Sequence, residues 1–327
     1  MLANHYDAAL FDLDGVIYLG PHAIPRVPES LKSLRDAGVR VGFVTNNAAR
    51  TPATVAAHLT ELGIEAVAED VVNSTMATIH MLAEHLEPGA KILPVGTEAL
   101  GEQLSNAGYT VVASKDDAPD AVVQGYNPRI DWALLEEGAF AIQQGAKWFA
   151  TNPDMTRPTE RGLVPGCGTQ IQVVGACVRA EPEIAGKPYP PLLEETVRRL
   201  SAQNPIFVGD RLDTDILGAN NVDMDSLFVF TGAHGKLDLR DADEAHRPTA
   251  IGYDVAALLA PKRVATLEAD TARCGDQVVA LEDGVAHLQT VPVGLESQLD
   301  ALWAALQLRW HKNADIDEVL AALEEVQ

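Results

Sequence analysis

Apolar runs that end abruptly in polar residues recur along this chain. The first run, AALF, leads into Asp12 and Asp14, and a second, VRVGFV, leads into Thr45. Continuous apolar runs of this length are typical of strands buried in a parallel sheet. Helical spacing of apolar residues follows each run, at 26–38 and at 51–63. Strand, helix, strand and helix in this order predict an α/β fold with a doubly wound, Rossmann-like parallel-sheet core.

A second α/β series interrupts the first. The pattern predicts a helix over 71–86 and then, after a Pro-Gly break, four short strands that alternate with two helices. The series closes at 151–178 with a loop rich in Pro, Gly and polar residues, followed by a helix. The expected division is a core formed by 1–82 and 182–260, an inserted α/β cap at 83–181, and a small α+β extension at 261–327.

The expected extension contains one strong hairpin signal. Asp283 and Gly284 lie between two apolar runs, and an Asp-Gly pair favours the tight turn of a β-hairpin. Two amphipathic helices are predicted after it. Trp303 and Trp310 lie seven positions apart on the first of these helices, a spacing that usually serves packing.

Composition and net charge limit the classes of partner that the protein is expected to bind. The chain has 24 Lys and Arg against 47 Asp and Glu, a net charge of −23, which opposes binding to nucleic acid or to anionic membranes. No apolar stretch is long enough for a membrane helix, and the N-terminal residues do not resemble a signal peptide. The three cysteines show no zinc-binding spacing. We therefore expect a cytoplasmic protein without a nucleic-acid or membrane partner.

The first candidate chemistry is the pair Asp12 and Asp14. Two like charges close together repel unless a cation or a proton lies between them, so the pair indicates a metal such as Mg²⁺. On a strand both side chains would point the same way, with Leu13 directed into the sheet. An isolated DxDG segment is equally compatible with a solvated turn at a strand end, so partners elsewhere in the chain must decide.

Three further polar clusters supply such partners. Carboxylate attack on phosphorus needs Mg²⁺ and a lysine to offset charge, together with hydroxyl or amide donors for the phosphoryl oxygens. A doubly wound sheet can bring such groups to one crevice at the strand ends. We predict that Asp215 holds the metal directly, through water, or by positioning the lysine, and that Asp213 is a solvated loop residue. Asp210 would share the metal with Asp12 and the backbone carbonyl of Asp14. The candidates for binding the phosphoryl group and substrate are Thr45, Asn46, Asn47 and Lys187.

The segments FDLDGV, VTNN, GKP and VGDRLDTDI resemble, in order and spacing, the four motifs of the haloacid-dehalogenase superfamily. This resemblance implies that Asp12 forms an aspartyl-phosphate and that Asp14 acts as general acid and then as base. It also implies that Thr45 and Lys187 hold the phosphoryl group. The gap between the first two motifs is too short for a cap, whereas the gap from Thr45 to Lys187 accommodates one. An insertion at that place resembles the NagD-type phosphatases.

The resemblance extends to the cap loop and to the C-terminal extension. NagD-type relatives share the TNPD segment, and their cap loop faces the leaving group, so Asn152, Asp154 and Arg157 are candidates for substrate selection. An Asx-turn with an exposed arginine is the alternative interpretation. The extension resembles the acetyltransferase-like (GNAT-like) fragment of actinobacterial glycerol-3-phosphate phosphatases. At about 65 residues it is too short for a whole acetyltransferase, and we expect a docked structural element or a homodimer contact.

These observations predict a Mg²⁺-dependent phosphomonoesterase for a small polyol or sugar phosphate, with glycerol 3-phosphate as the first candidate. Phosphoglycolate, nucleoside monophosphates and pyridoxal phosphate are alternative substrates. A phosphomutase shares the DxDG segment, but relatives of that kind carry a helical insert between the first two motifs. A non-catalytic binding or regulatory protein on the same fold is the alternative from another class. Asp14 argues against it, because a scaffold needs no second repelling carboxylate.

Overall fold

The computed structural model describes residues 1–159 and 161–326, and the chain forms two compact units. One unit consists of Met1–Val41 and Ala202–Gln327, and the other of Gly42–Ser201. The boundary between them falls inside β4 (Arg40–Thr45). The division into core, cap and extension expected from the sequence remains a proposal.

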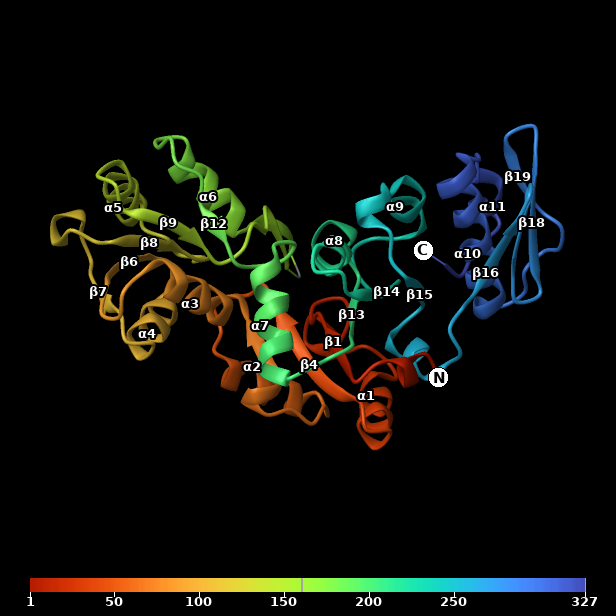
Figure 1. Ribbon diagram of the computed structural model, residues 1–327, viewed down its shortest axis with the longest axis horizontal. Helices are drawn as coiled ribbons and strands as arrows, with labels where there is room; N and C mark the ends of the chain where they lie inside the picture. Colours follow the sequence, from red (N-terminus) through yellow and green to blue (C-terminus); the bar gives the residue numbers. More distant parts are fainter. Residues whose placement is uncertain (160, 327) are drawn as a thin grey trace. The chain divides into compact units, whose positions relative to one another are not determined.

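The first unit contains a parallel sheet, a four-stranded antiparallel sheet and the two-stranded sheet β2-β3, together with the helices that cover them (Figure 1). Its strands are β1 (Ala8–Phe11), β2 (Tyr18–Leu19), β3 (His22–Ala23), β13 (Pro205–Gly209), β14 (Asp225–Val229), β15 (Ala250–Gly252), β16 (Ala265–Glu268), β17 (Thr271–Cys274), β18 (Gln277–Glu282) and β19 (Val285–Leu288). Its helices are α1 (Val27–Asp36), α8 (Leu217–Asn220), α9 (Lys236–Asp241), α10 (Leu295–Lys312) and α11 (Asp317–Ala321), with a π-helical turn at Leu212–Ile216.

The strand order β15-β14-β13-β1 forms a parallel sheet in this unit. All four residues of β1 are buried, as the continuous apolar run predicts. Phe11 pairs with Val208, so β1 and β13 end almost level with one another. Asp12 and Asp210 follow directly, and they leave the sheet at the same edge.

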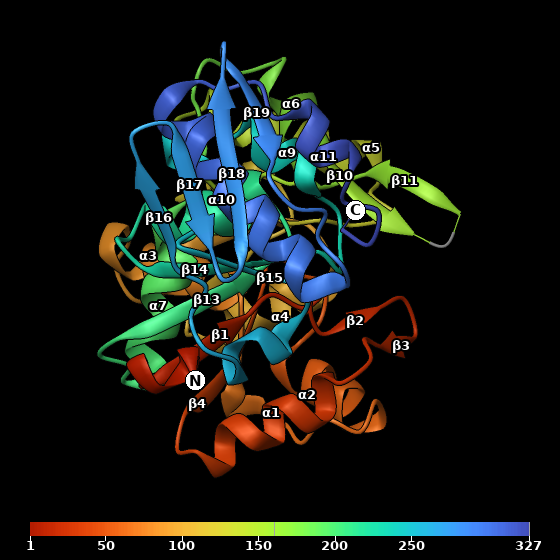
Figure 2. The same cartoon turned by 90° about the vertical axis from the view of Figure 1, so that its right-hand side faces the viewer.

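The extension is a four-stranded antiparallel sheet, β16-β17-β18-β19, with α10 against it (Figure 2). The predicted hairpin at Asp283-Gly284 is confirmed, and both residues have the positive φ that its turn requires. The β16–β17 hairpin was not predicted. Ala269 in its turn has φ +49°, a conformation for which alanine gives no sequence signal.

The second unit begins with β4 and contains the five-stranded sheet of the predicted cap. Its other strands are β5 (Val71–Asn73), β6 (Lys91–Val95), β7 (Thr110–Val111), β8 (Ala121–Gln124), β9 (Lys147–Ala150), β10 (Thr156–Thr159), β11 (Gly162–Pro165) and β12 (Glu183–Ile184). Its helices are α2 (Pro52–Glu61), α3 (Ser74–His85), α4 (Glu98–Asn106), α5 (Trp132–Gln143), α6 (Cys167–Gly175) and α7 (Pro190–Leu200). The sheet has the parallel order β12-β9-β8-β6-β7, with α5 and α6 on one face and α3 and α4 on the other (Figure 1).

Two predictions for this unit were wrong in detail. Residues 71–73 form β5 instead of the first turn of a helix, because Val71 and Val72 are buried beside β4 in a parallel pair. Asn73 then caps α3, since its side chain accepts a hydrogen bond from the N–H of Met76. The segment expected to be a plain loop after Thr151 contains the antiparallel hairpin β10–β11.

The fold class predicted from the sequence is confirmed: both units are built on parallel sheets with helices between the strands. Throughout the described part of the chain, every helix is too short or too polar to cross a bilayer.

Candidate active site

Three carboxylates gather at the ends of β1 and β13. Asp12, Asp210 and Asp215 each offer an oxygen, and these oxygens lie within 4.8 Å of one another. Asp210 and Asp215 are 2% and 1% exposed. Like charges this close repel in a buried site unless a cation lies between them. An all-oxygen donor set is the kind that Mg²⁺ prefers, so these residues fit the predicted metal.

Backbone N–H groups orient the two buried carboxylates. The N–H of Ala233 donates to Asp210 Oδ2 at 2.6 Å. The N–H groups of Asp210 and Arg211 both donate to Asp215 Oδ2 at 3.2 Å. The π-helical turn places Asp215 back over the end of β13, an irregularity common at functional sites. The turn is also supported by His234, whose Nδ1 accepts from the N–H of Leu212 at 2.9 Å.

Glycines leave the space that these carboxylates occupy. A Cβ at Gly232 would lie 1.8 Å from Asp210 Oδ2, and one at Gly15 would lie 2.6 Å from the same oxygen. Gly15 also has φ +87°, which side chains disfavour. Gly232 was not among the residues predicted for the site. Its signal was the position of a glycine just after an apolar strand run, FVFTG, in the same pattern as FDLDG.

The strand expected to carry Asp12 and Asp14 ends before them, whereas the predicted inward direction of Leu13 agrees with its burial. β1 ends at Phe11, and the chain bends so that Leu13 is buried while Asp14 is exposed. The bend is closed by the N–H of Gly15, which donates to the carbonyl of Tyr18 at 2.9 Å. Asp14 therefore lies in a turn that follows the strand. Its proposed metal contact is through the backbone carbonyl, and its carboxylate lies outside the group of three.

Asp213 is not part of this group either. Arg211 donates two hydrogen bonds to it, at 3.0 and 2.7 Å. Burial is the largest single influence and raises the pKa of Asp213, but the hydrogen bonds and charge of Arg211, together with His234 and a backbone hydrogen bond, lower the pKa by more. Its side chain is about half exposed, which agrees with the expected surface role.

A second polar cluster lies in the second unit, where Thr45, Asn46 and Lys187 are all buried. Asn46 Oδ1 accepts from the N–H of Lys187 at 2.8 Å, and Asn46 Nδ2 donates to the carbonyl of Lys187 at 3.0 Å. Thr45 Oγ1 accepts from the N–H of Asn47 at 3.1 Å, and Asn47 Oδ1 accepts from the N–H of Ala49. The segments VTNN and GKP thus come together although they are far apart in sequence.

The cap loop joins this cluster. Asn152 is buried, and its Nδ2 donates to the carbonyl of Asn46 at 2.7 Å. Its Oδ1 accepts from the N–H of Asp154, which is the Asx-turn considered as an alternative. Asp154 Oδ1 accepts from Asn46 Nδ2 at 3.0 Å. Arg157 is exposed, with its guanidinium 5.3 Å from the ring centre of Tyr126.

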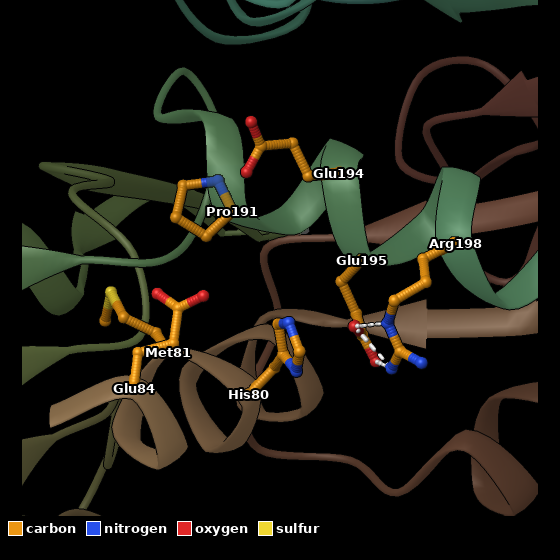
Figure 3. A pocket seen from close by; sticks show the side chains of 7 residues that line it. All are labelled: His80, Met81, Glu84, Pro191, Glu194, Glu195 and Arg198. Carbon is orange, nitrogen blue, oxygen red and sulfur yellow. Dashed lines mark hydrogen bonds and ion pairs between the residues drawn. The ribbon is translucent and has the colours of Figure 1, made fainter. Parts of the chain in front are cut away.

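Two other features carry no part of the predicted site. Burial raises the pKa of the Cys167 thiol to about 12, so this residue is not a thiolate nucleophile at neutral pH. A pocket between α3 and α7 contains Glu195, which accepts from Arg198 at 2.7 Å (Figure 3). Its lining is His80, Met81, Glu84, Pro191, Glu194, Glu195 and Arg198.

Comparisons with known proteins match these clusters to a family. The model described as haloacid dehalogenase-like hydrolase matches residues 9–110, and a second one, HAD-hydrolase-like, matches residues 184–258. The D-glycerol 3-phosphate phosphatase of Mycobacterium tuberculosis is 45% identical over 257 residues, which are 79% of this chain and 72% of that protein. The chain belongs to the haloacid dehalogenase-like hydrolases.

Other members of the family are similar as well. The acid sugar phosphatase of Staphylococcus epidermidis is 33% identical over 73% of this chain and 92% of that protein. The crystal structure of the glycerol phosphate phosphatase from Mycobacterium tuberculosis with calcium has a TM-score of 0.85 at 37% identity, covering 99% of this chain and 97% of the other. Its structure with magnesium has a TM-score of 0.82, covering 99% and 98%. The prediction of a phosphatase in this family is confirmed.

Proposed function

We propose that this phosphatase hydrolyses a small polyol phosphate, with glycerol 3-phosphate as the preferred substrate, in a Mg²⁺-dependent reaction. The observation that carries the proposal is the cluster of Asp12, Asp210 and Asp215 at the ends of adjacent parallel strands. The similarity to a glycerol 3-phosphate phosphatase supports the choice of substrate. The structures of that relative with magnesium and with calcium support a divalent cation bound by oxygen ligands.

The proposed reaction has two steps. In the first, an oxygen of Asp12 forms a bond to phosphorus while the bond to the alkoxide oxygen breaks, and Asp14 gives that oxygen its proton. In the second, Asp14 takes a proton from water, which attacks phosphorus and releases phosphate and Asp12. Asp14 is exposed, which suits a group that must exchange protons with both the leaving group and water.

The remaining residues are proposed to bind Mg²⁺ and to hold the phosphoryl group of the substrate. Asp12, Asp210, Asp215 and the backbone carbonyl of Asp14 would hold Mg²⁺, which when bound would neutralise charge on the phosphoryl oxygens. Thr45 and Lys187 would bind the same phosphoryl group, since a hydroxyl and an ammonium supply the donors and the positive charge that it needs.

Substrate selection is assigned to the cap loop. Arg157 is the strongest of the three candidates, because it is exposed and its guanidinium is steadied by the ring of Tyr126. Asn152 is buried and bonded to backbone groups on both sides of its amide. Its role in selection is therefore indirect. Asp154 is partly exposed and remains a candidate for contact with a substrate hydroxyl.

The test is a panel of phosphate-release assays. The panel contains glycerol 3-phosphate, phosphoglycolate, a nucleoside monophosphate, pyridoxal phosphate and 4-nitrophenyl phosphate, each assayed with EDTA, with Mg²⁺ and with Zn²⁺. We expect glycerol 3-phosphate to have the highest kcat/KM, EDTA to abolish turnover and Mg²⁺ to restore it. A much higher kcat/KM on another substrate would refute the choice of glycerol 3-phosphate. Restoration of activity by Zn²⁺ alone would refute the proposal that Mg²⁺ is the metal. No turnover of any compound would favour the hypothesis of a non-catalytic binding protein.

We also propose a cytoplasmic location and a homodimer. The three cysteines, all of them free, support the first, because disulfides are rare in cytosolic proteins. Light scattering of the purified protein at several concentrations tests the second. A mass that stays at one chain at all concentrations would refute it.

A further inference from the structure

The side chain of Asn46 is bonded to both peptide groups that flank one residue. Its Oδ1 accepts from the N–H of Lys187 at 2.8 Å, and its Nδ2 donates to the carbonyl of Lys187 at 3.0 Å. Two bonds of opposite direction to the same residue restrict rotation of the backbone on both sides of its Cα. The direction in which the buried Lys187 side chain leaves the backbone is thereby fixed.

The second amide hydrogen of Asn46 is used as well. Nδ2 donates to Asp154 Oδ1 at 3.0 Å, so both hydrogens of the amide have protein acceptors. The backbone carbonyl of Asn46 accepts from Ser74 Oγ and from Asn152 Nδ2, each at 2.7 Å. A substrate hydroxyl could receive a hydrogen bond from the side chain of Asn46 only if one of the two contacts of Nδ2 broke.

Close packing around Gly186 leaves no space for the neighbouring segments to shift. A Cβ at Gly186 would lie 2.7 Å from Asn46 Oδ1 and 2.7 Å from the Cβ of Asn152. The glycine before Lys187 is therefore needed for the amide of Asn46 to reach the lysine backbone. Segments 45–47, 151–154 and 186–187 meet around a single side chain.

We propose that Asn46 is a positioning residue, which orients Lys187 and ties it to the cap loop through Asp154, and that it does not contact the substrate. This inference rests on the proposed function, in which Lys187 holds the phosphoryl group. It replaces the expectation from the sequence that Asn46 binds substrate. A change at Asn46 must then affect every substrate equally, because the phosphoryl group is common to all of them.

The first variant is Asn46→Ala. We expect kcat/KM to fall on the order of 100-fold, as for a catalytic group displaced by about 1 Å, and to the same extent on glycerol 3-phosphate and on 4-nitrophenyl phosphate. The inhibition constant for inorganic phosphate should rise at least about tenfold, because a misplaced lysine binds the product less well. Both quantities come from steady-state kinetics on the full chain with saturating Mg²⁺.

Asn127→Ala is the matched control. Asn127 also bridges two backbone groups in the same unit: its Nδ2 donates to the carbonyl of Gly96 at 2.8 Å, and its Oδ1 accepts from the N–H of Arg129 at 2.9 Å. Its removal should lower Tm by an amount similar to Asn46→Ala. The inhibition constant for phosphate should not change, since Asn127 does not contact Lys187.

A second pair of variants keeps the size of the side chain. Asn46→Asp retains an acceptor for the N–H of Lys187 but sets a carboxylate against both Asp154 and the carbonyl of Lys187, so phosphate inhibition should weaken at least as much as in Asn46→Ala. Adding Asp154→Asn returns an amide donor to that contact. The double variant should recover phosphate affinity several-fold over Asn46→Asp alone, a coupling expected of directly bonded residues.

Three results would overturn the inference. These are a loss confined to glycerol 3-phosphate, an Asn46→Ala variant with lowered Tm but wild-type phosphate inhibition, and a double variant without recovery. Failure of the proposed function would look different, because the wild-type chain itself would then release no phosphate. In that event, calorimetric titration of inorganic phosphate into the wild type and Asn46→Ala still tests whether Asn46 positions Lys187.

Discussion

At the scale of single residues, electrostatics dominates the site. Unit charges 4.8 Å apart repel by about 3 kcal/mol at an effective dielectric constant of about 20. Asp12, Asp210 and Asp215 therefore destabilise the folded protein when no cation is bound. The same repulsion becomes affinity for a divalent ion, because binding the ion removes it.

This argument gives opposite signs for stability and activity in Asp12→Asn. Loss of one charge removes two repulsive pairs, but Asp12 is partly exposed and solvent screens its charge, so the metal-free protein should be stabilised by roughly 1 to 3 kcal/mol, less than the sum of the two pairs. Turnover should fall on the order of 10⁴-fold or more, because the nucleophile cannot be replaced by its neighbours. Denaturant unfolding in EDTA and phosphate release in Mg²⁺ measure the two effects. Hydrolysis of glycerol 3-phosphate at near wild-type rate would refute the assignment of the nucleophile.

At the scale of elements, loops after buried strands set the geometry of the site. The loop after β14 brings Gly232 against Asp210, and it also supplies the N–H of Ala233 to that carboxylate. The loop after β9 carries Asn152 and Asp154, and the hairpin that follows carries Arg157. A substitution in the loop after β14 should therefore affect magnesium binding, whereas one in the hairpin after β9 should affect substrate selectivity.

Gly232→Ala should weaken magnesium binding. The new Cβ would lie 1.8 Å from Asp210 Oδ2 and must displace it, so the Mg²⁺ concentration for half-maximal activity should rise about 10- to 100-fold. Gly101→Ala in α4 is the control. Its Cβ would be 3.6 Å from the nearest atom, and it should stabilise the helix by roughly 0.5 to 1 kcal/mol with unchanged magnesium dependence. Equal magnesium dependence in both variants would contradict the inference that Gly232 leaves space for the metal-binding carboxylate of Asp210.

Arg157→Ala should change selectivity. A lost hydrogen bond from a charged donor costs about 1.5 to 3 kcal/mol, so kcat/KM on glycerol 3-phosphate should fall about 10-fold or more, while that on 4-nitrophenyl phosphate should hardly change. Tyr126→Phe preserves the aromatic face beneath Arg157 and should behave as wild type. Equal losses on both substrates would show that Arg157 serves folding of the cap loop instead.

At the scale of the whole molecule, the C-terminal extension is part of the folding of the first unit. One continuous apolar cluster contains Phe228 of β14 and Ile251 of β15, in the parallel sheet of this unit, and Leu302 and Leu306 of α10. Polar contacts cross the same boundary: Trp310 Nε1 donates to the carbonyl of Leu239 at 3.1 Å. The extension is thus docked against the rest of the first unit, which is one of the two arrangements expected from the sequence.

Leu306→Ala should therefore destabilise the unit that carries the aspartates, although the residue belongs to the extension. Leu306 is fully buried, and truncating such a side chain costs about 2 to 5 kcal/mol. Leu237→Ala on α9 is the control, since Leu237 is 54% exposed and should change stability by less than about 0.5 kcal/mol. Activity after heating measures the effect. Loss of activity at the same temperature in both variants would show that the extension folds independently.

Features that depend on local pattern and on residue chemistry could be predicted before the structure was known. Apolar runs marked β1, β4 and β13 because a buried parallel strand has no polar face, and Thr51 and Pro52 marked the start of α2. The order of the polar clusters along the chain indicated the family. The carboxylates Asp12, Asp210 and Asp215 could be predicted as a group because parallel strands bring their following residues to one edge.

The tertiary structure decided whatever depends on contacts between distant segments. Asn46 could be predicted as a polar residue of the site, but only the bonds to Lys187 and Asp154 show that its amide is already used. Gly232 gains its importance from the approach of Asp210, and Ala269 takes a positive φ that its own side chain disfavours. In each case the energy of a long-range contact outweighs the local preference, and sequence pattern records only the local preference.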